Sequence, residues 1–415
     1  MNRTTLSYTF KSEDIKKLKE KVLHFAQGSS AFSVLDNHQY EIEPSKFELL
    51  AGINAFQILN FETIDSIEDW VMGQLNFEFQ PKSPQEEQYT CFVPETIILI
   101  PKNSRELIIS SYQNPQVILE TILAQKATKN ESQSRTQVQP IFEMDKETYI
   151  QTVNQIRQDI FEGTYYELNY CVPFVYEVSH LNPLELYLQQ SQINPAPMSG
   201  FYRFQDQYIM CTSPERFLSK EKNILRTQPI KGTSPKSANE QEDLKHKIAL
   251  QNSIKERAEH IMIVDLSRND LAKCSRINAV TVPELFGIYS FPFVHQMIST
   301  IQGEVLPGLS FSQIWYNTYP MGSMTGAPKN TVVQHIQKYE AQKRKAYSGS
   351  LFYKTPDGDF DSNVVIRSFE YDAVLQQLSF KVGSAITYDS VAEQEWQELQ
   401  WKSKSMLSFI DAVQS

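Results

Sequence analysis

A polar stretch at Gln125–Gln139 is the sequence feature that most constrains the fold, because no hydrophobic period runs through it. Polar residues, with Ser and Thr prominent, replace the regularly spaced apolar residues that a buried helix or strand needs. Such a composition is typical of an exposed connector. We therefore expect the chain to divide here into an N-terminal region, residues 1–135, and a second region, residues 140–415.

The segments on either side of this connector carry the patterns of both helices and strands. The clearest helix is predicted over Asp145–Glu162, where apolar residues follow the helical period and Gly163 provides a stop. Further elements are predicted at Ser12–Phe25 (helix), Phe92–Ile100 and Leu107–Ser110 (strands), and Pro356–Asp359 (hairpin turn). No repeat of fixed period occurs. These elements predict an α+β architecture with much antiparallel sheet.

Composition and charge argue against several classes of partner. With 39 Lys plus Arg against 49 Asp plus Glu, the net charge is -10 and no basic patch stands out, so nucleic acid is not an expected partner. The apolar runs fall far short of the roughly 20 residues that span a bilayer, so a membrane is not expected either. The four cysteines lie far apart without CxxC spacing, which favours reduced thiols and a cytoplasmic location.

Two helical segments each carry a pair of glutamates three residues apart, Glu256 with Glu259 and Glu395 with Glu398. This spacing places both carboxylates of a pair on one face of a helix. Four facing carboxylates would suit Mg²⁺, which prefers oxygen ligands and keeps several waters. Helix capping and a surface ion pair with Lys402 account for the same residues without a metal. The spacing alone leaves both interpretations open.

A series of motifs then follows in a fixed order along the second region. These motifs are Ser213–Phe217, Pro229–Thr233, Ala258–His260, Asp265–Leu271, Val294–His295, Gly322–Lys329, Tyr347–Gly349, Ile366–Ser368 and Asp389–Ser390. In content and order they resemble the chorismate-utilising enzyme family, which includes the anthranilate, aminodeoxychorismate and isochorismate synthases. The resemblance implies an α+β, anthranilate-synthase-like fold, in which antiparallel sheets form a two-layer core with helices on the outside.

The resemblance also assigns the acidic helices to a Mg²⁺ site. It implies that Glu259 and Glu398 bind the ion directly and that Glu256 and Glu395 bind it through water. The ion would in turn hold the ring carboxylate of chorismate.

Residues elsewhere match positions that contact chorismate in the family. They are Gly232 and Thr233 beside the ring carboxylate, Tyr347, Arg367 and Lys402 at the enolpyruvyl carboxylate, Gly383 near the substrate, and His295 near the leaving hydroxyl. An always-charged guanidinium suits the task assigned to Arg367. Without the resemblance, we would interpret Arg367 as a structural ion-pair residue, Tyr347 as core packing and His295 as a satisfied buried imidazole.

Lys231 in the Pro229–Thr233 motif indicates which reaction the chain performs. Anthranilate and isochorismate synthases carry Ala there, whereas aminodeoxychorismate synthases carry Lys, so the resemblance implies covalent catalysis by the amine of Lys231. It also implies that Glu215 is the general acid for the departing hydroxyl. A lysine with an ordinary pKa is almost fully protonated near neutral pH, so we expect burial or nearby positive charge to lower the pKa of Lys231. The alternative is a solvated loop lysine.

Two positions depart from the family pattern. Glu167 stands where ammonia-using relatives usually have Gln and where water-using relatives place a base lysine, so activation of water by lysine is disfavoured. Gly383–Ala385 replaces a turn that is often richer in glycine. These departures leave open how ammonia is screened from water and how closely the substrate is held at that turn.

The source of ammonia points to a partner protein. None of the four cysteines lies in the Gly-x-Cys-x-Gly setting of a class I glutaminase nucleophile, so a separate glutamine amidotransferase is implied. The function implied is therefore that of aminodeoxychorismate synthase component I, which converts chorismate and ammonia to 4-amino-4-deoxychorismate for para-aminobenzoate and folate synthesis. The alternatives are anthranilate synthase component I and a non-catalytic subunit that activates a glutaminase.

Overall fold

The structure, a computed structural model, describes residues 2–42, 44–80, 84–125 and 136–414. Most of the predicted connector, residues 126–135, lies outside the described residues. The connector ends earlier than the sequence predicts, because Val138–Phe142 forms strand β7 and pairs with β8 (Glu167–Val178). Pairing with a buried strand orders residues 138 and 139, which the sequence pattern assigned to the connector.

The strands pair antiparallel and form two sheets that are joined through the long strand β5 (Tyr89–Pro101). The first sheet contains, in spatial order around β5, β1 (Thr4–Thr9), β6 (Glu106–Ser111), β5, β3 (Phe47–Leu59), β2 (Ala31–Asp36), β9 (Met198–Phe204), β10 (Gln207–Ser213), β19 (Ser368–Asp372), β20 (Gln377–Thr387), β8 and β7. The short strand β16 (Gly326–Ala327) pairs with the beginning of β8.

The second sheet extends from β4, which also pairs with β5. It contains β4 (Val71–Leu75), β17 (Ser350–Lys354), β18 (Phe360–Asn363), β11 (Arg216–Glu221), β12 (Ile224–Gln228) and β15 (Val294–Glu304), with β13 (Ile230–Pro235) and β14 (Thr281–Ser290) paired to β15. Strand β2 of the N-terminal region pairs with β9, and β4 pairs with β17. The two regions predicted from the sequence therefore share both sheets.

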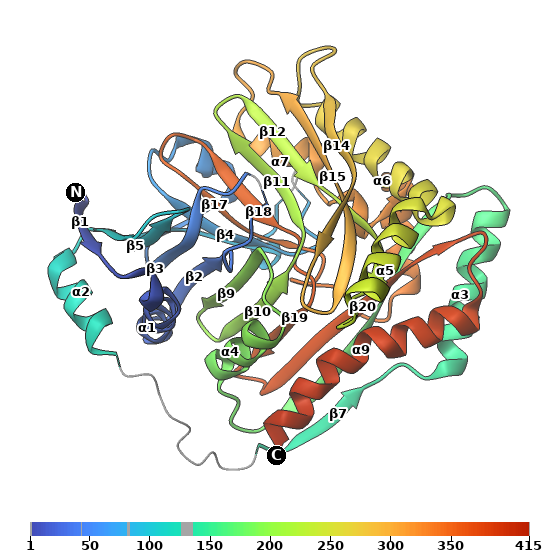
Figure 1. The fold of residues 1–415 in the computed structure, drawn as a ribbon, viewed down its shortest axis with the longest axis horizontal. Coiled ribbons are helices and arrows are strands. Elements are labelled where there is room, and N and C mark those ends of the chain that lie inside the picture. Colours follow the sequence, from blue (N-terminus) through green and yellow to red (C-terminus); the bar gives the residue numbers. More distant parts are fainter. Residues whose placement is uncertain (1, 43, 81–83, 126–135, 415) are drawn as a thin grey trace.

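Helices cover the outer faces of the two sheets (Figure 1). Those that pack on the first sheet are α1 (Ile15–Gln27), α2 (Pro115–Ala124), α3 (Lys146–Phe161), α4 (Pro183–Ile193), α8 (Lys329–Tyr339) and α9 (Ala392–Gln414). Against the second sheet lie α5 (Glu240–Asn252) and α6 (Ile254–Ala272), with α7 (Phe311–Thr318) packed on α6. Helix α9 runs along β20 and packs against α3, which brings the C-terminal segment beside β20.

Separate hydrophobic clusters fill the spaces between these layers. Tyr149, Val153 and Phe201 belong to the cluster between the first sheet and its helices. A second cluster, around Trp315 and Phe352, packs on the second sheet. A third cluster is formed by residues from strands of both sheets. The predicted fold class, antiparallel sheets in a layered core with helices outside, is confirmed.

The local predictions hold where the hydrophobic period was regular. The helix predicted over Asp145–Glu162 is α3, in which Asp145 caps the N-terminus by accepting the N–H of Thr148 at 2.8 Å. Gly163 ends it with a φ of 80°, a conformation that favours glycine.

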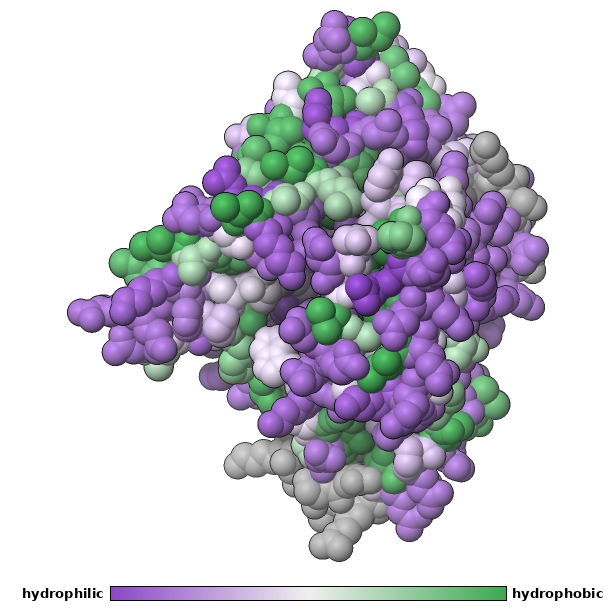
Figure 2. Space-filling view, turned by 90° about the vertical axis from the view of Figure 1, so that its right-hand side faces the viewer, coloured by the Kyte–Doolittle hydropathy of each residue, from purple (hydrophilic) through white to green (hydrophobic). Residues whose placement is uncertain are grey.

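Among the described residues, no helix is long and apolar enough to cross a membrane. Figure 2 shows a face on which hydrophilic residues predominate and hydrophobic residues form small groups.

Candidate active site

Lys231 extends from β13 toward a group of carboxylates. Its Nζ atom donates to Oε1 of Glu167 at 2.9 Å and lies 3.9 Å from Oε2 of Glu259, and the side chain is only 17% exposed. Lys231 is therefore not a solvated loop lysine. Two elements distant in sequence, β8 and α6, meet at its ammonium group.

A buried histidine holds the backbone of Lys231 in place. The Nδ1–H of His260 donates to the carbonyl oxygen of Lys231 at 2.8 Å, and Nε2 lies 2.7 Å from the hydroxyl of Ser299. Burial lowers the pKa of His260, so the imidazole is neutral and its Nε2 accepts the hydroxyl proton of Ser299. These hydrogen bonds connect β13 to α6 and β15 at Lys231.

The pKa of Lys231 differs from the expectation drawn from the sequence. Burial alone would lower it, but the Glu167 carboxylate, followed by those of Glu259 and Glu256, more than offsets the burial and raises the pKa above its ordinary value. The expectation of a lowered pKa was wrong for these contacts, because the lysine is surrounded by negative rather than positive charge. Lys231 must therefore give up a proton before it can act as a nucleophile.

Glu167 lies at the first residue of β8, where the backbone allows little freedom. Its neighbour across the ladder is Ala327 of β16, and Gly326 has a φ of 144°. A Cβ atom at Gly326 would lie 2.0 Å from the carbonyl oxygen of Glu167, so only glycine permits this approach. The Glu167 side chain is 1% exposed, and its Oε2 atom has no hydrogen-bond partner among the described residues.

Glu215 is the second buried carboxyl group near Lys231. It follows β10, with its backbone N–H donating to the hydroxyl of Ser213 at 3.1 Å. Burial raises the pKa of Glu215 to about 7, although the Ser323 hydroxyl, the Ile230 backbone and the charge of Lys231 act in the opposite direction. A cavity of about 20 Å³ adjoins Glu215, which is room for roughly one water. A carboxyl group in this state can donate a proton near neutral pH.

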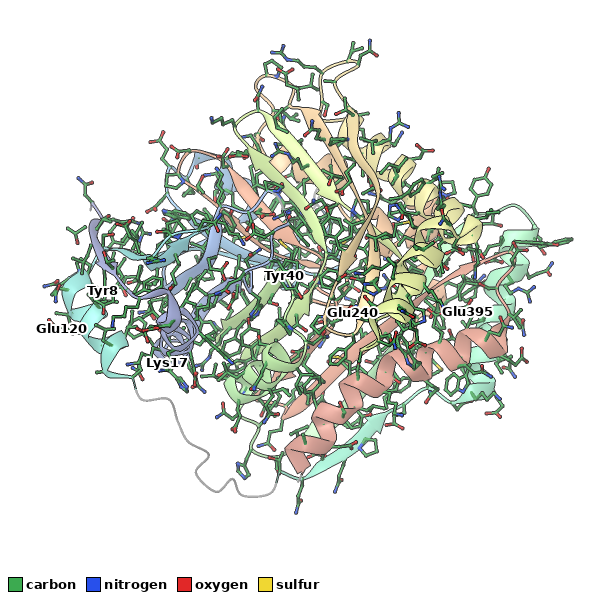
Figure 3. The ribbon with its side chains drawn as sticks, in the orientation of Figure 1. Tyr8, Lys17, Tyr40, Glu120, Glu240 and Glu395 are labelled. Atoms are coloured by element: carbon green, nitrogen blue, oxygen red, sulfur yellow. The ribbon has the colours of Figure 1, made fainter. Side chains whose placement is uncertain are left out.

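The two acidic helices converge on the same place. The charge of Lys231 acts on Glu259 of α6 and on Glu398 of α9, and Lys255 of α6 acts on Glu395 and Glu398. The Glu256 carboxylate lies against the backbone of Gly232. Figure 3 shows Glu395 between α9 and the helices α5 and α6.

The charges of this cluster do not balance. Burial raises the pKa of Glu259 and of Glu395, and the neighbouring glutamate of the same pair raises each further. Lysines pair with some of the carboxylates, at 2.6 Å between Lys402 and Glu398 and 3.9 Å between Lys255 and Glu259. No three carboxylates of the described residues are close enough together to form a complete cation site. The cluster nevertheless has five carboxylates against three ammonium groups: Glu167, Glu256, Glu259, Glu395 and Glu398 with Lys231, Lys255 and Lys402. An excess of negative charge on oxygen ligands fits a divalent cation.

Three of the predicted substrate residues meet at Gly383, which lies within strand β20 and not in the turn that the sequence predicts at Gly383–Ala385. Lys402 donates to the carbonyl oxygen of Gly383 at 3.1 Å, and a Cβ atom at Gly383 would lie 3.4 Å from the hydroxyl oxygen of Tyr347. Tyr347 is 5% exposed. Because Lys402 also pairs with Glu398, this part of β20 adjoins the acidic helix α9.

Arg367 differs from an ordinary structural arginine. Among the described residues its guanidinium has no carboxylate partner, and its backbone φ is 50°. Its carbonyl oxygen accepts hydrogen bonds from the backbone N–H of Thr212 at 3.1 Å and from the amide of Gln190 at 2.7 Å. An unpaired, partly buried guanidinium suits an anionic ligand.

Comparison with known proteins agrees with this geometry. The family model for chorismate binding enzymes matches residues 10–408. The chain belongs to this family. Aminodeoxychorismate synthase component 1 of Escherichia coli is 37% identical over 61% of this chain, and that of Klebsiella aerogenes is 33% identical over 72%. Anthranilate synthase component 1 of Saccharolobus solfataricus is 32% identical over 64% of the chain and 63% of its own length.

Solved structures of other chorismate-using enzymes share the fold of this chain. Anthranilate synthase component I of Streptococcus pneumoniae superposes with a TM-score of 0.75 at 23% identity, covering 88% of this chain and 93% of that one. The menaquinone-specific isochorismate synthase of Escherichia coli gives a TM-score of 0.78 at 15% identity, covering 98% and 94%. The matched part spans only 56% and 66% of the length of the two aminodeoxychorismate synthase relatives.

One residue assigned from the chorismate-binding family lies apart from this cluster. His295 is fully buried, and its ring lies between Asp243 of α5 at 2.7 Å and Ser290 of β14 at 3.0 Å. No contact between His295 and Lys231 or Glu215 occurs among the described residues. These contacts fit the alternative interpretation of His295, a buried imidazole whose hydrogen bonds are satisfied. The hydrogen bond to Asp243 also holds α5 against β15.

Some residues at the site were not identified from the sequence. His260 falls within a family motif, but only the tertiary contact with the Lys231 carbonyl reveals what it does. Gln296 is buried opposite Thr233 in the β13–β15 ladder, with Oε1 lacking a partner among the described residues. Ser323 lies in the glycine-rich motif and contacts Glu215. No periodicity or composition distinguishes these residues from ordinary core positions.

Proposed function

We propose that this chain converts chorismate and ammonia to 4-amino-4-deoxychorismate, as the relatives named aminodeoxychorismate synthase do. The observation that carries the proposal is the placement of a buried lysine and a protonatable buried glutamic acid beside one acidic cluster. A lysine nucleophile needs an acid to help the leaving group depart, and Lys231 with Glu215 provides that pair. Membership of the chorismate binding enzymes supplies the substrate class.

The acidic cluster would hold Mg²⁺, with Glu259 and Glu398 as direct ligands and Glu256 and Glu395 acting through water. When bound, the ion supplies a positive charge for the ring carboxylate of the substrate. Arg367, Tyr347 and Lys402 bind the enolpyruvyl carboxylate, while Gly232 and Thr233 let the backbone approach the ring. These residues fix the ring in front of Lys231.

The chemistry then proceeds by two substitutions. Lys231 first passes its ammonium proton to Glu167, its hydrogen-bond partner, and regains that proton when it is released. As a neutral amine it forms a bond to C2 of the ring, both ring double bonds shift, and the C4–O bond breaks. Glu215 gives its proton to the departing hydroxyl, which leaves as water. Ammonia next forms a bond to C4 and expels Lys231 as an amine, which restores the ring double bonds. The ammonium group of the product returns a proton to Glu215. Overall, one ammonia replaces one water.

The reaction requires a source of ammonia. The four cysteines, Cys91, Cys171, Cys211 and Cys274, are all buried, and burial raises the pKa of each thiol. A buried thiol with a raised pKa is a poor nucleophile for glutamine hydrolysis. We therefore include in the proposal a separate glutamine amidotransferase partner and a transaminase-type classification, in a cytoplasmic setting.

A product assay tests the proposal. Purified protein is incubated with chorismate, ammonium chloride and MgCl₂, and the products are separated and identified by mass and fluorescence. We expect 4-amino-4-deoxychorismate, without release of pyruvate. Anthranilate with pyruvate would establish the alternative activity of anthranilate synthase. No turnover at saturating ammonium, with stimulation of a glutaminase partner intact, would establish the scaffold alternative.

A further inference from the structure

Arg344, in the segment between α8 and β17, is a buried arginine that no step of the proposed reaction uses. Its side chain is 1% exposed and pairs with Glu340, with Nε 2.9 Å from Oε2 and Nη2 2.5 Å from Oε1. The guanidinium also donates to the carbonyl oxygens of Met324 at 2.6 Å and Asn169 at 2.7 Å, and to the hydroxyl of Ser348 at 3.4 Å. These contacts use all five of its N–H groups.

The first segment that Arg344 holds is the turn that carries Ser323. Ser323 directly precedes Met324, and its hydroxyl forms a hydrogen bond that lowers the pKa of Glu215, against the effect of burial. The side-chain amide of Asn169 donates to the carbonyl oxygen of Ser323 at 3.3 Å, so β8 holds the same turn. Without the guanidinium, the Met324 carbonyl would be released and the Ser323 hydroxyl could move away from Glu215.

The other two segments that Arg344 holds also carry residues of the site. Asn169 lies in β8, two residues after Glu167, and Ser348 directly follows Tyr347. One cation therefore connects three segments that come from distant parts of the sequence. Lysine could replace the charge but not these contacts, because an ammonium group donates from a single point whereas a guanidinium is a planar fork.

The N-terminal region in turn holds Arg344. The guanidinium carbon lies 4.2 Å from the centre of the Phe77 ring, and the Glu78 carboxylate accepts the backbone N–H groups of Arg344 at 2.6 Å and Lys345 at 3.1 Å. Packing alone does not require a charge at this depth, because burial of a charged group costs free energy that an apolar side chain avoids. A buried guanidinium fixed from both sides therefore indicates a need for directed hydrogen bonds.

We propose that Arg344 is a positioning residue for proton transfer, holding the turn Gly322–Met324 so that Ser323 stays hydrogen-bonded to the acid Glu215. This inference rests on the proposed function, in which Glu215 protonates the departing hydroxyl. In this role Arg344 acts through the turn and not on the substrate itself. It keeps the carboxyl group of Glu215 in a fixed orientation while the C4–O bond breaks.

Other charged groups lie near Glu215, and among the described residues none of them forms a hydrogen bond or ion pair with Arg344. Lys231 of β13 acts on Glu215 directly, and Asp270 of α6 and Arg216 of β11 line the cavity beside it. A substitution at position 344 that keeps the positive charge therefore affects Glu215 through the turn and not through these groups.

The pH dependence of kcat, measured at saturating chorismate and ammonium, tests the role of Arg344. Arg344→Lys keeps the charge and should still pair with Glu340, but it should not reach both carbonyl oxygens. Loss of the Ser323 hydrogen bond raises the pKa of Glu215, so its acidic form persists to higher pH. We expect the decline of kcat to move upward by roughly half a pH unit to one unit, and kcat at pH 7 to fall roughly tenfold.

Arg3→Lys is the matched control, because Arg3 makes the same kinds of contact in the N-terminal region. It pairs with Asp69 at 2.9 Å, donates to the carbonyl oxygen of Glu95 at 3.0 Å and lies 4.3 Å from the centre of the Tyr112 ring. Both lysine variants should unfold at lower urea concentration than the parent. Only Arg344→Lys should change the pH profile, and loss of stability with the parent's profile in Arg344→Lys would overturn the inference.

Ser323→Ala separates the positioning role from a purely structural one. It should give the same upward shift with little loss of stability, and the Arg344→Lys/Ser323→Ala double variant should shift no further than Ser323→Ala alone. A shift in the double variant equal to the sum of the two single shifts would show that Arg344 does not act through Ser323, and would overturn the inference.

If Arg344→Lys does not fold, Glu340→Gln takes its place, because it weakens the pair that fixes the guanidinium. A smaller shift in the same direction is then expected, and an unchanged profile would contradict the role of Arg344. Absence of the amino product from the parent protein would instead refute the proposed function.

Discussion

Replacing Glu215 by Gln should stabilise the protein in a pH-dependent way while abolishing amination. Burial raises the pKa of Glu215 from 4.5 to about 7. Between these two values the folded chain holds a proton that the unfolded chain has lost, so the stability falls as the pH rises through this window. Gln carries no charge, so the stability of the Glu215→Gln variant does not fall with pH in this way. At about 1.4 kcal/mol per pH unit, the gain above pH 7 amounts to roughly 3 kcal/mol.

Urea unfolding at pH 5.5 and at pH 8 measures this effect. Part of the gain is already present at pH 5.5, so the difference between variant and parent should grow by roughly 2 kcal/mol between the two conditions. Glu106→Gln in the exposed part of β6 is the matched control and should show no such growth. An equal gain at both pH values would refute the argument that Glu215 is a buried carboxyl with a raised pKa.

The same substitution separates stability from activity. The side-chain amide of the Glu215→Gln variant has no acidic proton, so the hydroxyl group of chorismate would have to leave without protonation. We expect the variant to bind chorismate but to lose most turnover. In the parent protein, kcat should fall as the pH rises above about 7, because the acidic form of Glu215 is lost. Gain of stability together with loss of activity is the pattern expected for a destabilising catalytic group.

The other predictions concern the amine, the backbone and the metal. Lys231→Ala should lose most formation of the amino product while retaining chorismate binding by calorimetry; unchanged turnover would contradict the covalent role. Gly326→Ala should lower the urea unfolding free energy by about 3 kcal/mol or more and impair activity, because a Cβ atom there meets the Glu167 carbonyl. Gly358→Ala, with a φ of 79° but open space around it, should lower it by only about 1–2 kcal/mol, and equal effects would argue against the clash. Glu259→Gln should raise the Mg²⁺ concentration for half-maximal activity by about tenfold or more, whereas Glu393→Gln, exposed on α9, should not; equal effects would remove Glu259 from the metal site.

Local periodicity predicted the elements of this fold well, and the reason is physical. The apolar residues of α3 pack on one face, so their spacing in the sequence is the spacing of a helix. Strand β7 was missed because its order comes from pairing with β8, not from its own residues. The sharing of sheets between the two regions depends on pairings such as β2 with β9, which no local pattern encodes.

The site was predicted unevenly for a related reason. A spacing of three residues placed Glu256 with Glu259 on one helix face, but only the tertiary structure brings α6 and α9 to the same cluster. The family motif identified Lys231, yet the direction of its pKa shift depends on which charges surround it in space. Glu167 stood out only as a departure from its relatives, and its contact with Lys231 explains why that position matters.

Arg367 shows that the site and the fold make different demands on one residue. Stability alone would favour glycine at a φ of 50° and a carboxylate partner for a buried guanidinium, and this residue has neither among the described contacts. The left-handed backbone costs about 1–2 kcal/mol, and the hydrogen bonds from Thr212 and Gln190 to the Arg367 carbonyl hold the backbone in it. A backbone held in this way aims the side chain, and a guanidinium left unpaired keeps its donors for a ligand. Both features are unfavourable for the free protein, and in the function proposed above an anionic substrate would offset them by pairing with the guanidinium.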